Sequence, residues 1–257
     1  MTTSLIPTIF VAHGSPMLAL DDKAGATYQQ WAQSLPQPKA LLVVSAHWEA
    51  DELELGETGR HDNLIYDFYG FPDALYELQY PAPGAPQLAE TVSALLRDSY
   101  PLRKTTRGLD HGVWVPLLRM WPDANIPVLQ LALPRSFEDR ALFELGRRLA
   151  PLREQGVMIV GSGVLTHNLR EAFAGHHATT PEWVQLFDTW VEQHAKRPDS
   201  LITWRTEAPH AARNHPTPEH FLPLLVVAGA ASADDAVSFP ITGYEYGVLT
   251  RRCVQYG

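Results

Sequence analysis

Short apolar runs alternate with longer amphipathic segments along most of the chain. Runs that are apolar throughout are typical of strands buried on both faces of a parallel sheet. Apolar positions spaced by three and four residues indicate helices that cover such a sheet. The pattern predicts strands over 8–12, 40–46, 126–133 and 157–163, and helices over 26–35, 86–98 and 181–196.

Local signals predict several further elements. Asp110 precedes an apolar stretch with Pro116 in its first turns and is expected to cap a helix. Ser136 is the expected N-cap of a clear amphipathic helix that Gly156 ends. The remaining predictions are helices over 72–79 and 216–230, and strands over 237–242 and 247–254.

The alternation of strands and helices predicts the fold class. Parallel strands need helical crossovers, which cover both faces of the sheet. No internal repeat or long linker divides the 257 residues. We therefore expect one α/β domain over 1–257, with a central, mainly parallel or mixed sheet and helices on both faces.

Composition and charge narrow the function classes. The formal net charge of −9 argues against nucleic acid as a partner, because such binding relies on Lys and Arg contacts to phosphate. The longest apolar run, 222–231, is too short to span a bilayer, so no membrane partner is expected. The single cysteine, Cys253, and the absence of a basic residue before Lys23 favour a cytoplasmic location.

Histidines follow three of the predicted strands. His13, His47 and His167 come at or just after the carboxyl ends of the strands that start at 8, 40 and 157. Ligands of open α/β sheets bind outside these ends. Imidazole is a common ligand for zinc and iron, so a catalytic metal site is predicted here. His220, expected in the first turn of an apolar helix beside Glu219, and His111 are further candidates.

The other histidines are in polar surroundings and are interpreted as surface or loop residues: His61, His176, His177, His194, His210 and His215. Several competing chemistries are excluded by spacing. Thr166 stands where the third glycine of a dinucleotide-binding loop would follow Gly161 and Gly163. Neither Ser15 nor Ser162 lies in the G-x-S-x-G turn of a serine hydrolase.

Six motifs in order resemble the class III (LigB-type) extradiol ring-cleaving dioxygenases, most closely the 4,5-DOPA dioxygenase subgroup. The motifs are AHGSPM (12–17), VVSAHW (43–48), DFYGFPDALYELQYPAPG (67–84), LDHGVWVPL (109–117), VGSGVLTHNLR (160–170) and NHPTPEHFLPL (214–224). The sequence departs from the expected pattern at Tyr66, where relatives carry a histidine, and at the inserted His215. Both departures are expected to affect substrate contacts rather than metal binding.

The resemblance implies roles for the histidines. It assigns His13, His47 and His220 to the metal, and His167 to acid–base catalysis, with metal binding by His167 in a resting or zinc-loaded form as an alternative. His111 would contact the substrate or dioxygen.

The implied reaction is opening of a DOPA-like catechol ring with O₂ at Fe(II), with Zn(II) expected in the protein as purified. A zinc-dependent hydrolase using the same histidines is the alternative, and a homo-oligomer is possible.

Overall fold

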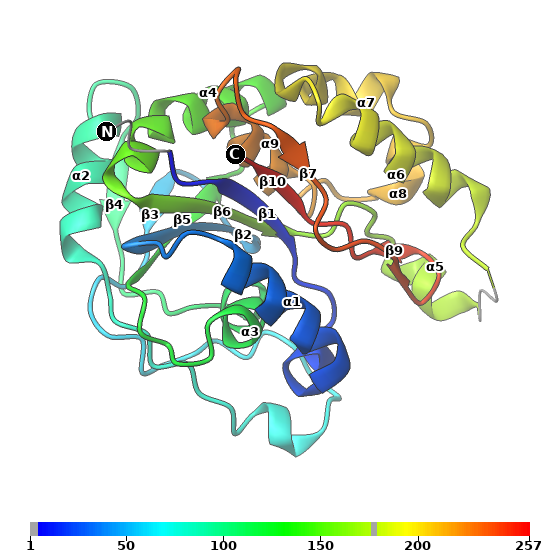
Figure 1. Cartoon of the computed structure of the whole chain (residues 1–257), viewed down its shortest axis with the longest axis horizontal. Coiled ribbons are helices and arrows are strands. Elements are labelled where there is room, and N and C mark those ends of the chain that lie inside the picture. The colour runs from blue at the N-terminus through cyan, green and yellow to red at the C-terminus, as the bar shows by residue number, and fades with distance from the viewer. Residues whose placement is uncertain (1–4, 176–178) are drawn as a thin grey trace.

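A mixed β-sheet runs through the centre of the protein (Figure 1), seen in a computed structural model that describes residues 5–175 and 179–257. Within these residues, eight strands form the sheet in the order β4-β3-β5-β2-β6-β1-β10-β7. Strands β5, β2, β6 and β1 are parallel neighbours, and β10 and β7 continue the sheet in antiparallel pairing. The predicted α/β fold with a mixed sheet is confirmed.

The sheet strands are β1 (Thr8–Ala12), β2 (Ala40–Ala50), β3 (Leu53–Leu55), β4 (Leu102–Lys104), β5 (Val128–Pro134), β6 (Val157–Gly163), β7 (Val237–Ser238) and β10 (Val254–Tyr256). A separate hairpin pairs β8 (Tyr244–Glu245) with β9 (Leu249–Thr250). The helices are α1 (Asp22–Ser34), α2 (Pro86–Leu96), α3 (His111–Met120), α4 (Asp139–Leu149), α5 (Leu169–Ala174), α6 (Glu182–His194), α7 (Trp204–Glu207), α8 (Ala211–Asn214) and α9 (Leu222–Ala230).

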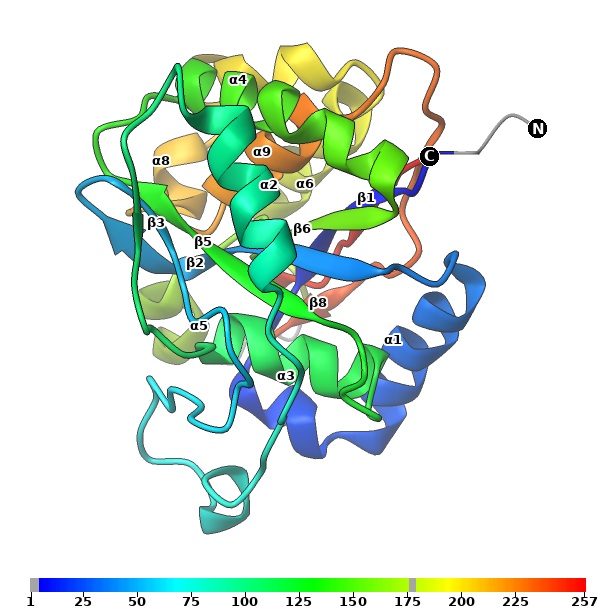
Figure 2. The same ribbon diagram turned by 90° about the vertical axis from the view of Figure 1, so that its left-hand side faces the viewer.

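Helices cover both faces of the sheet, as Figure 2 shows. Successive residues of a strand point to opposite faces. Leu42 and Val44 of β2 accordingly pack in the core formed with α2, α4 and α9, whereas Leu41 and Val43 pack in the core formed with α1 and α3. The sheet therefore has an apolar core on each face, which explains why its strands are apolar throughout.

Two predicted element boundaries and one predicted cap need correction. Residues 72–79 form only a short 3₁₀ turn, Asp73–Leu75, because Pro72 and the proline-rich segment that follows leave little room for a helix. Helix α4 begins after Glu138 rather than Ser136, and its continuation ends at Gly156 as predicted. Asp110 does precede α3, but its side chain accepts hydrogen bonds from Ser45 and Gln130 instead of capping the helix.

Two C-terminal predictions also need correction. Helix α9 starts at Leu222 rather than 216, because the His220 carbonyl accepts a hydrogen bond from Val164 N of the neighbouring segment at 3.1 Å. His220 therefore lies in a turn just before the helix. The predicted strand over 247–254 is divided between β9 and β10, because the chain leaves the small hairpin there and enters the central sheet.

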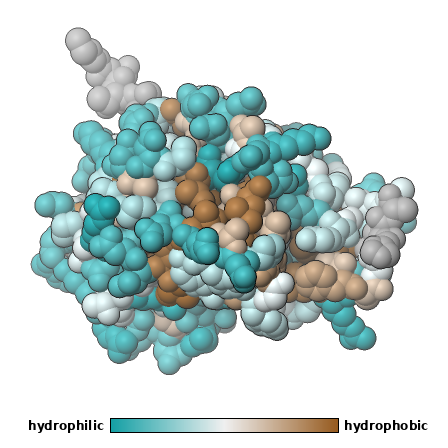
Figure 3. All heavy atoms as spheres, turned by 90° about the horizontal axis from the view of Figure 1, so that it is seen from below, coloured by the Kyte–Doolittle hydropathy of each residue, from teal (hydrophilic) through white to brown (hydrophobic). Residues whose placement is uncertain are grey.

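The outer surface over α1 and α3 is mainly hydrophilic, with hydrophobic groups gathered toward the middle of the face (Figure 3). Among the described residues, no helix combines the length and the apolar character needed to cross a membrane.

Candidate metal centre and active site

The candidate site lies at the carboxyl edge of the parallel strands. His13 directly follows β1, and His167 comes four residues after β6, as predicted. His47 lies inside β2 rather than after it, since the strand continues to Ala50. The pairing of β2 with β5 shifts register between Val44 and Glu49. Such irregularities commonly redirect side chains next to active sites, and here the shift surrounds His47.

A glycine allows the His220 turn to approach β6. A Cβ atom on Gly163 would lie 2.1 Å from the His220 carbonyl oxygen, a distance that no side chain can occupy. His13 N also donates to the Gly163 carbonyl at 3.1 Å. The glycine of the VGSG motif thus brings the end of β1 and the turn before α9 together.

Five of the described histidines converge at this edge. Ring-centroid distances are 4.9 Å for His13–His47, 5.3 Å for His13–His220, 4.9 Å for His47–His220 and 4.0 Å for His47–His111. His167 stacks on His220, with ring centroids 3.4 Å apart. The structure therefore brings together all five histidines singled out from the sequence.

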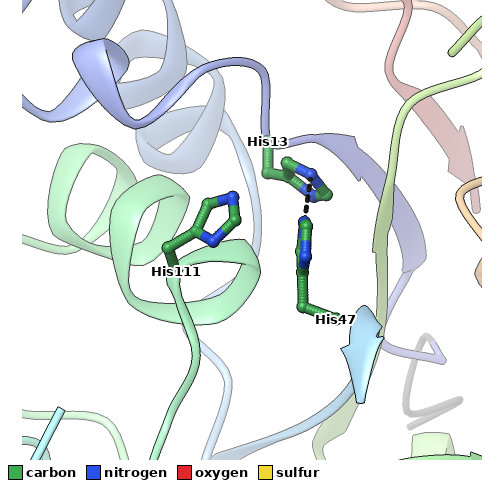
Figure 4. Close-up of side chains that lie close together, drawn as sticks. All are labelled: His13, His47 and His111. Carbon is green, nitrogen blue, oxygen red and sulfur yellow. Dashed lines mark hydrogen bonds between the residues drawn. The ribbon is translucent and has the colours of Figure 1, made fainter. Parts of the chain in front are cut away.

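The candidate ligand atoms fall into two separate groups. The imidazole nitrogens of His13, His47 and His111 lie within 4.8 Å of one another and form a possible metal site (Figure 4). His167, Glu219 and His220 form a second group within the same limit. Within this limit the nitrogen of His111, rather than that of His220, accompanies those of His13 and His47, which the sequence did not indicate.

The hydrogen bonds of His13 determine which of its nitrogens faces the centre. Ser162 Oγ donates to the Gly112 carbonyl and accepts from His13 Nδ1 at 2.9 Å. His13 Nε2 then carries a lone pair and lies 3.1 Å from His47 Nε2, the contact marked in Figure 4. Asp67 faces the Nδ1 side of His47 at 3.5 Å, so the His47 Nε2 lone pair faces inward too. A shared cation stabilises two facing lone pairs.

The donor set fits a transition metal. Two imidazole nitrogens bound at about 2.0–2.1 Å to one ion are about 2.9–3.4 Å apart for ordinary coordination angles, which includes the observed Nε2 separation. His220 Nε2 is buried and has no hydrogen-bond partner among the described residues. Its Nδ1 lies 2.9 Å from Glu219 Oε1. A buried nitrogen without a hydrogen-bond partner destabilises the folded protein, and a bound metal ion would remove this penalty.

Asp67 is the contact that sequence reasoning missed. Its Oδ1 accepts from His111 Nδ1 at 2.8 Å and from His111 N at 3.0 Å. Burial alone would raise the Asp67 pKa, but the hydrogen bonds and charge of His111 outweigh it, and the pKa is about 2. Asp67 is the acidic residue of the DFYGFP motif, and that acidic residue was the available signal in the sequence.

Burial keeps the site imidazoles neutral. Loss of hydration is the largest cause that lowers the pKa of His47 to about 3 and that of His167 to about 4, and neighbouring imidazoles add to it. The same cause holds the pKa of His13 and His220 well below the usual value. Neutral imidazole is the form that binds metals.

The metal-free protein should consequently lose stability in mild acid. The histidines of the unfolded chain have pKa values of about 6.5 and bind protons below that pH. The same histidines stay neutral in the folded protein, because their pKa values are lower there. The free energy of unfolding should fall as pH decreases from 6.5 toward 4, by up to about 1.4 kcal/mol per pH unit for each such histidine. Urea unfolding at pH 7.0 and 5.5 measures this change. Equal stability at both values would contradict it.

Two histidines interpreted as surface or loop residues are buried. His61 Nε2 donates to the Val128 carbonyl at 3.0 Å, and His215 Nε2 donates to the Leu165 carbonyl at 2.9 Å. Both histidines stabilise the backbone through these hydrogen bonds. The polar residues around them in the sequence did not indicate that they are buried. His176 and His177 lie outside the described residues. Tyr66 donates to the Leu78 carbonyl at 2.6 Å and stabilises its own loop.

Comparison with known proteins agrees with this fold. Residues 6–250 match the family described as the catalytic LigB subunit of aromatic ring-opening dioxygenase. Because the match spans almost the whole chain, the protein belongs to this family of extradiol dioxygenases and is an enzyme.

Individual relatives indicate the subgroup. The chain is 38% identical over 252 residues to "4,5-DOPA dioxygenase extradiol" of Beta vulgaris, covering 95% of this chain and 93% of the relative. It is 39% identical over 271 residues to the protein of the same name from Escherichia coli strain K12, covering 100% and 97%. A crystal structure of an uncharacterized protein from Escherichia coli K12 superposes with a TM-score of 0.82 at 34% identity, covering 98% of this chain and 100% of that one.

Proposed function

We propose that this enzyme opens the aromatic ring of a DOPA-like catechol with O₂, at an Fe(II) ion held by His13, His47 and His220. The convergence of neutral imidazoles, with their Nδ1 sides hydrogen-bonded or facing a carboxylate, is the observation that carries this proposal. Three neutral ligands would leave a bound ion its 2+ charge, which would favour an anionic catechol at the site.

His220 is proposed as the third ligand in preference to His111. Its Nε2 atom is buried and has no hydrogen-bond partner among the described residues, whereas no such atom is found on His111. His111 stands at the start of α3 against Phe68, with ring centroids 5.7 Å apart. This position beside the aromatic loop suits a residue that contacts the substrate. Phe68 then provides one wall for the ring of the catechol.

His167 is proposed as the acid–base residue. Its pKa of about 4 leaves the imidazole neutral at pH 7, so it can accept a proton from a catechol hydroxyl. The charge of a catecholate beside the ring would raise the pKa of His167 toward the working pH, which favours later return of the proton. A bound Fe(II) ion would supply electron transfer to O₂, which d¹⁰ Zn(II) cannot, and Zn(II) is expected in the protein as purified.

Anaerobic reconstitution tests the proposed function. The protein is loaded with Fe(II), titrated with DOPA, and then exposed to oxygen. We expect a yellow ring-opened product to form with Fe(II) and none with Zn(II). Hydrolysis of an ester or amide by the zinc form under anaerobic conditions, without ring opening by the iron form, would instead support the zinc-hydrolase alternative.

A further inference from the structure

Two carboxylates contact the site histidines from the outside. Glu219 Oε1 lies 2.9 Å from His220 Nδ1. Asp67 Oδ1 lies 2.8 Å from His111 Nδ1, and its Oδ2 lies 3.5 Å from His47 Nδ1. An ionised carboxylate only accepts hydrogen bonds. The hydrogen bonds to His111 and His220 therefore place the imidazole hydrogen on Nδ1 and leave Nε2 as the metal-binding or substrate-facing nitrogen, and the nearby charge of Asp67 favours the same tautomer of His47.

Both carboxylates are themselves fixed in place. Thr217 Oγ1 donates to Glu219 Oε1 at 3.0 Å, and the backbone N of His111 donates to Asp67 Oδ1 at 3.0 Å. Their side chains are only 17% and 25% exposed. They differ in this respect from the exposed ion pairs of the surface, whose members contribute little to affinity or stability. Their positions are determined by the same segments that position the histidines.

Asp67 and Glu219 also place negative charge next to the site histidines. The third proposed ligand, His13, is held by the neutral hydroxyl of Ser162. If a divalent metal were bound among three neutral imidazoles, Asp67 and Glu219 would compensate its charge from the outer side of the rings they contact. Such outer contacts orient the ligand and raise the basicity of the imidazole.

We propose that Asp67 and Glu219 are positioning residues that fix the tautomer and direction of His47, His111 and His220 and compensate the metal charge from outside the ligand set. This inference rests on the metal site of the proposed function. Neither carboxylate binds the ion itself.

Metal affinity measures this role directly. Purified Glu219→Gln and Asp67→Asn proteins, stripped of metal, compete with a chromophoric chelator for Zn(II). Each variant keeps the side-chain size and an oxygen acceptor but loses the charge. We expect Zn(II) affinity to fall about 10–100-fold in each, the usual effect of losing an outer partner. Glu54→Gln is the matched control, because Glu54 is 15% exposed, pairs with Arg103 and lies on β3 away from the histidines. It should bind Zn(II) like the wild type.

A spectroscopic measurement separates positioning from a structural role. The visible absorption of bound Co(II) reports the geometry and the donors of the ligand set. We expect the Co(II) absorption bands to shift in Glu219→Gln. The melting temperature of the metal-free Glu219→Gln protein should equal that of the metal-free Glu54→Gln control. Glu219→Asp, which restores the charge at a shorter reach, should recover part of the affinity. If Glu219→Gln fails to fold, Thr217→Val removes the hydroxyl that holds Glu219 and should still lower affinity.

The outcomes distinguish this inference from the proposed function. A wild-type protein without Zn(II) or Co(II) affinity would overturn the metal site and the proposed function with it. Wild-type affinity retained in both Glu219→Gln and Asp67→Asn would overturn only the positioning role. X-ray absorption showing a carboxylate oxygen on Zn(II) in the wild type that disappears in Glu219→Gln would also overturn it, because Glu219 would then be a ligand.

Discussion

Replacing His13, His47 or His220 singly by alanine should remove the metal and abolish ring opening. These residues are the three proposed ligands, and His13 and His220 are almost completely buried. Alanine leaves a gap that supplies no donor atom. The loss of Zn(II) affinity should exceed the roughly 10–100-fold cost of losing an outer hydrogen-bond partner. Metal content of each purified variant, measured by plasma emission spectroscopy, tests this expectation, and oxygen consumption with DOPA follows the activity.

Two substitutions at one position provide the control for this experiment. His220→Glu replaces one donor by another and should keep metal, whereas His220→Leu removes the donor and should not. If all three alanine variants retain full metal occupancy, the ligand assignment is wrong. If His220→Ala alone retains metal, His111, whose nitrogen lies within 4.8 Å of those of His13 and His47, is the residue to test as the third ligand.

His167→Ala should separate chemistry from binding. If His167 moves the proton, the variant should keep Fe(II) and bind catechol while turnover falls about 10²–10⁴-fold, the usual contribution of a positioned acid or base. His167 stacks face to face on His220 at 3.4 Å. A stacked ring directs its nitrogens beside those of its neighbour, so it can contact a substrate without replacing a ligand. Anaerobic catechol titration followed by admission of oxygen measures the two properties in one sample.

The alternative results for His167 are equally informative. Loss of metal and of catechol binding together would make His167 a ligand. Turnover close to that of the wild type would remove His167 from the mechanism, and His111 would become the proposed base. His194→Ala is a suitable control. His194 also stacks on an aromatic ring, that of Trp190, but it lies at the end of α6 and is not one of the five converging histidines.

The sequence was sufficient to predict the fold class and the convergence of the histidines. The apolar runs ending at Ala12 and Gly163 correspond to β1 and β6, and the carboxyl ends of parallel neighbours necessarily meet at one edge. His13 and His167 could be placed there from local pattern alone. The predicted helix over 72–79 failed because of its prolines, a local property of the sequence. The predicted cap at Ser136 failed because packing decides between neighbouring start signals, and α4 begins after Glu138.

Only the tertiary structure decided which groups meet at the nitrogens. His111 and Asp67 are 44 residues apart, and His13 and Ser162 are 149 apart. No periodicity relates such positions, because their approach depends on strand order and on the Gly163 contact that admits the His220 turn. Local sequence thus determined where the strands are and which side chains follow them. The choice of hydrogen-bond partner, and with it the direction of each lone pair, was set by long-range packing.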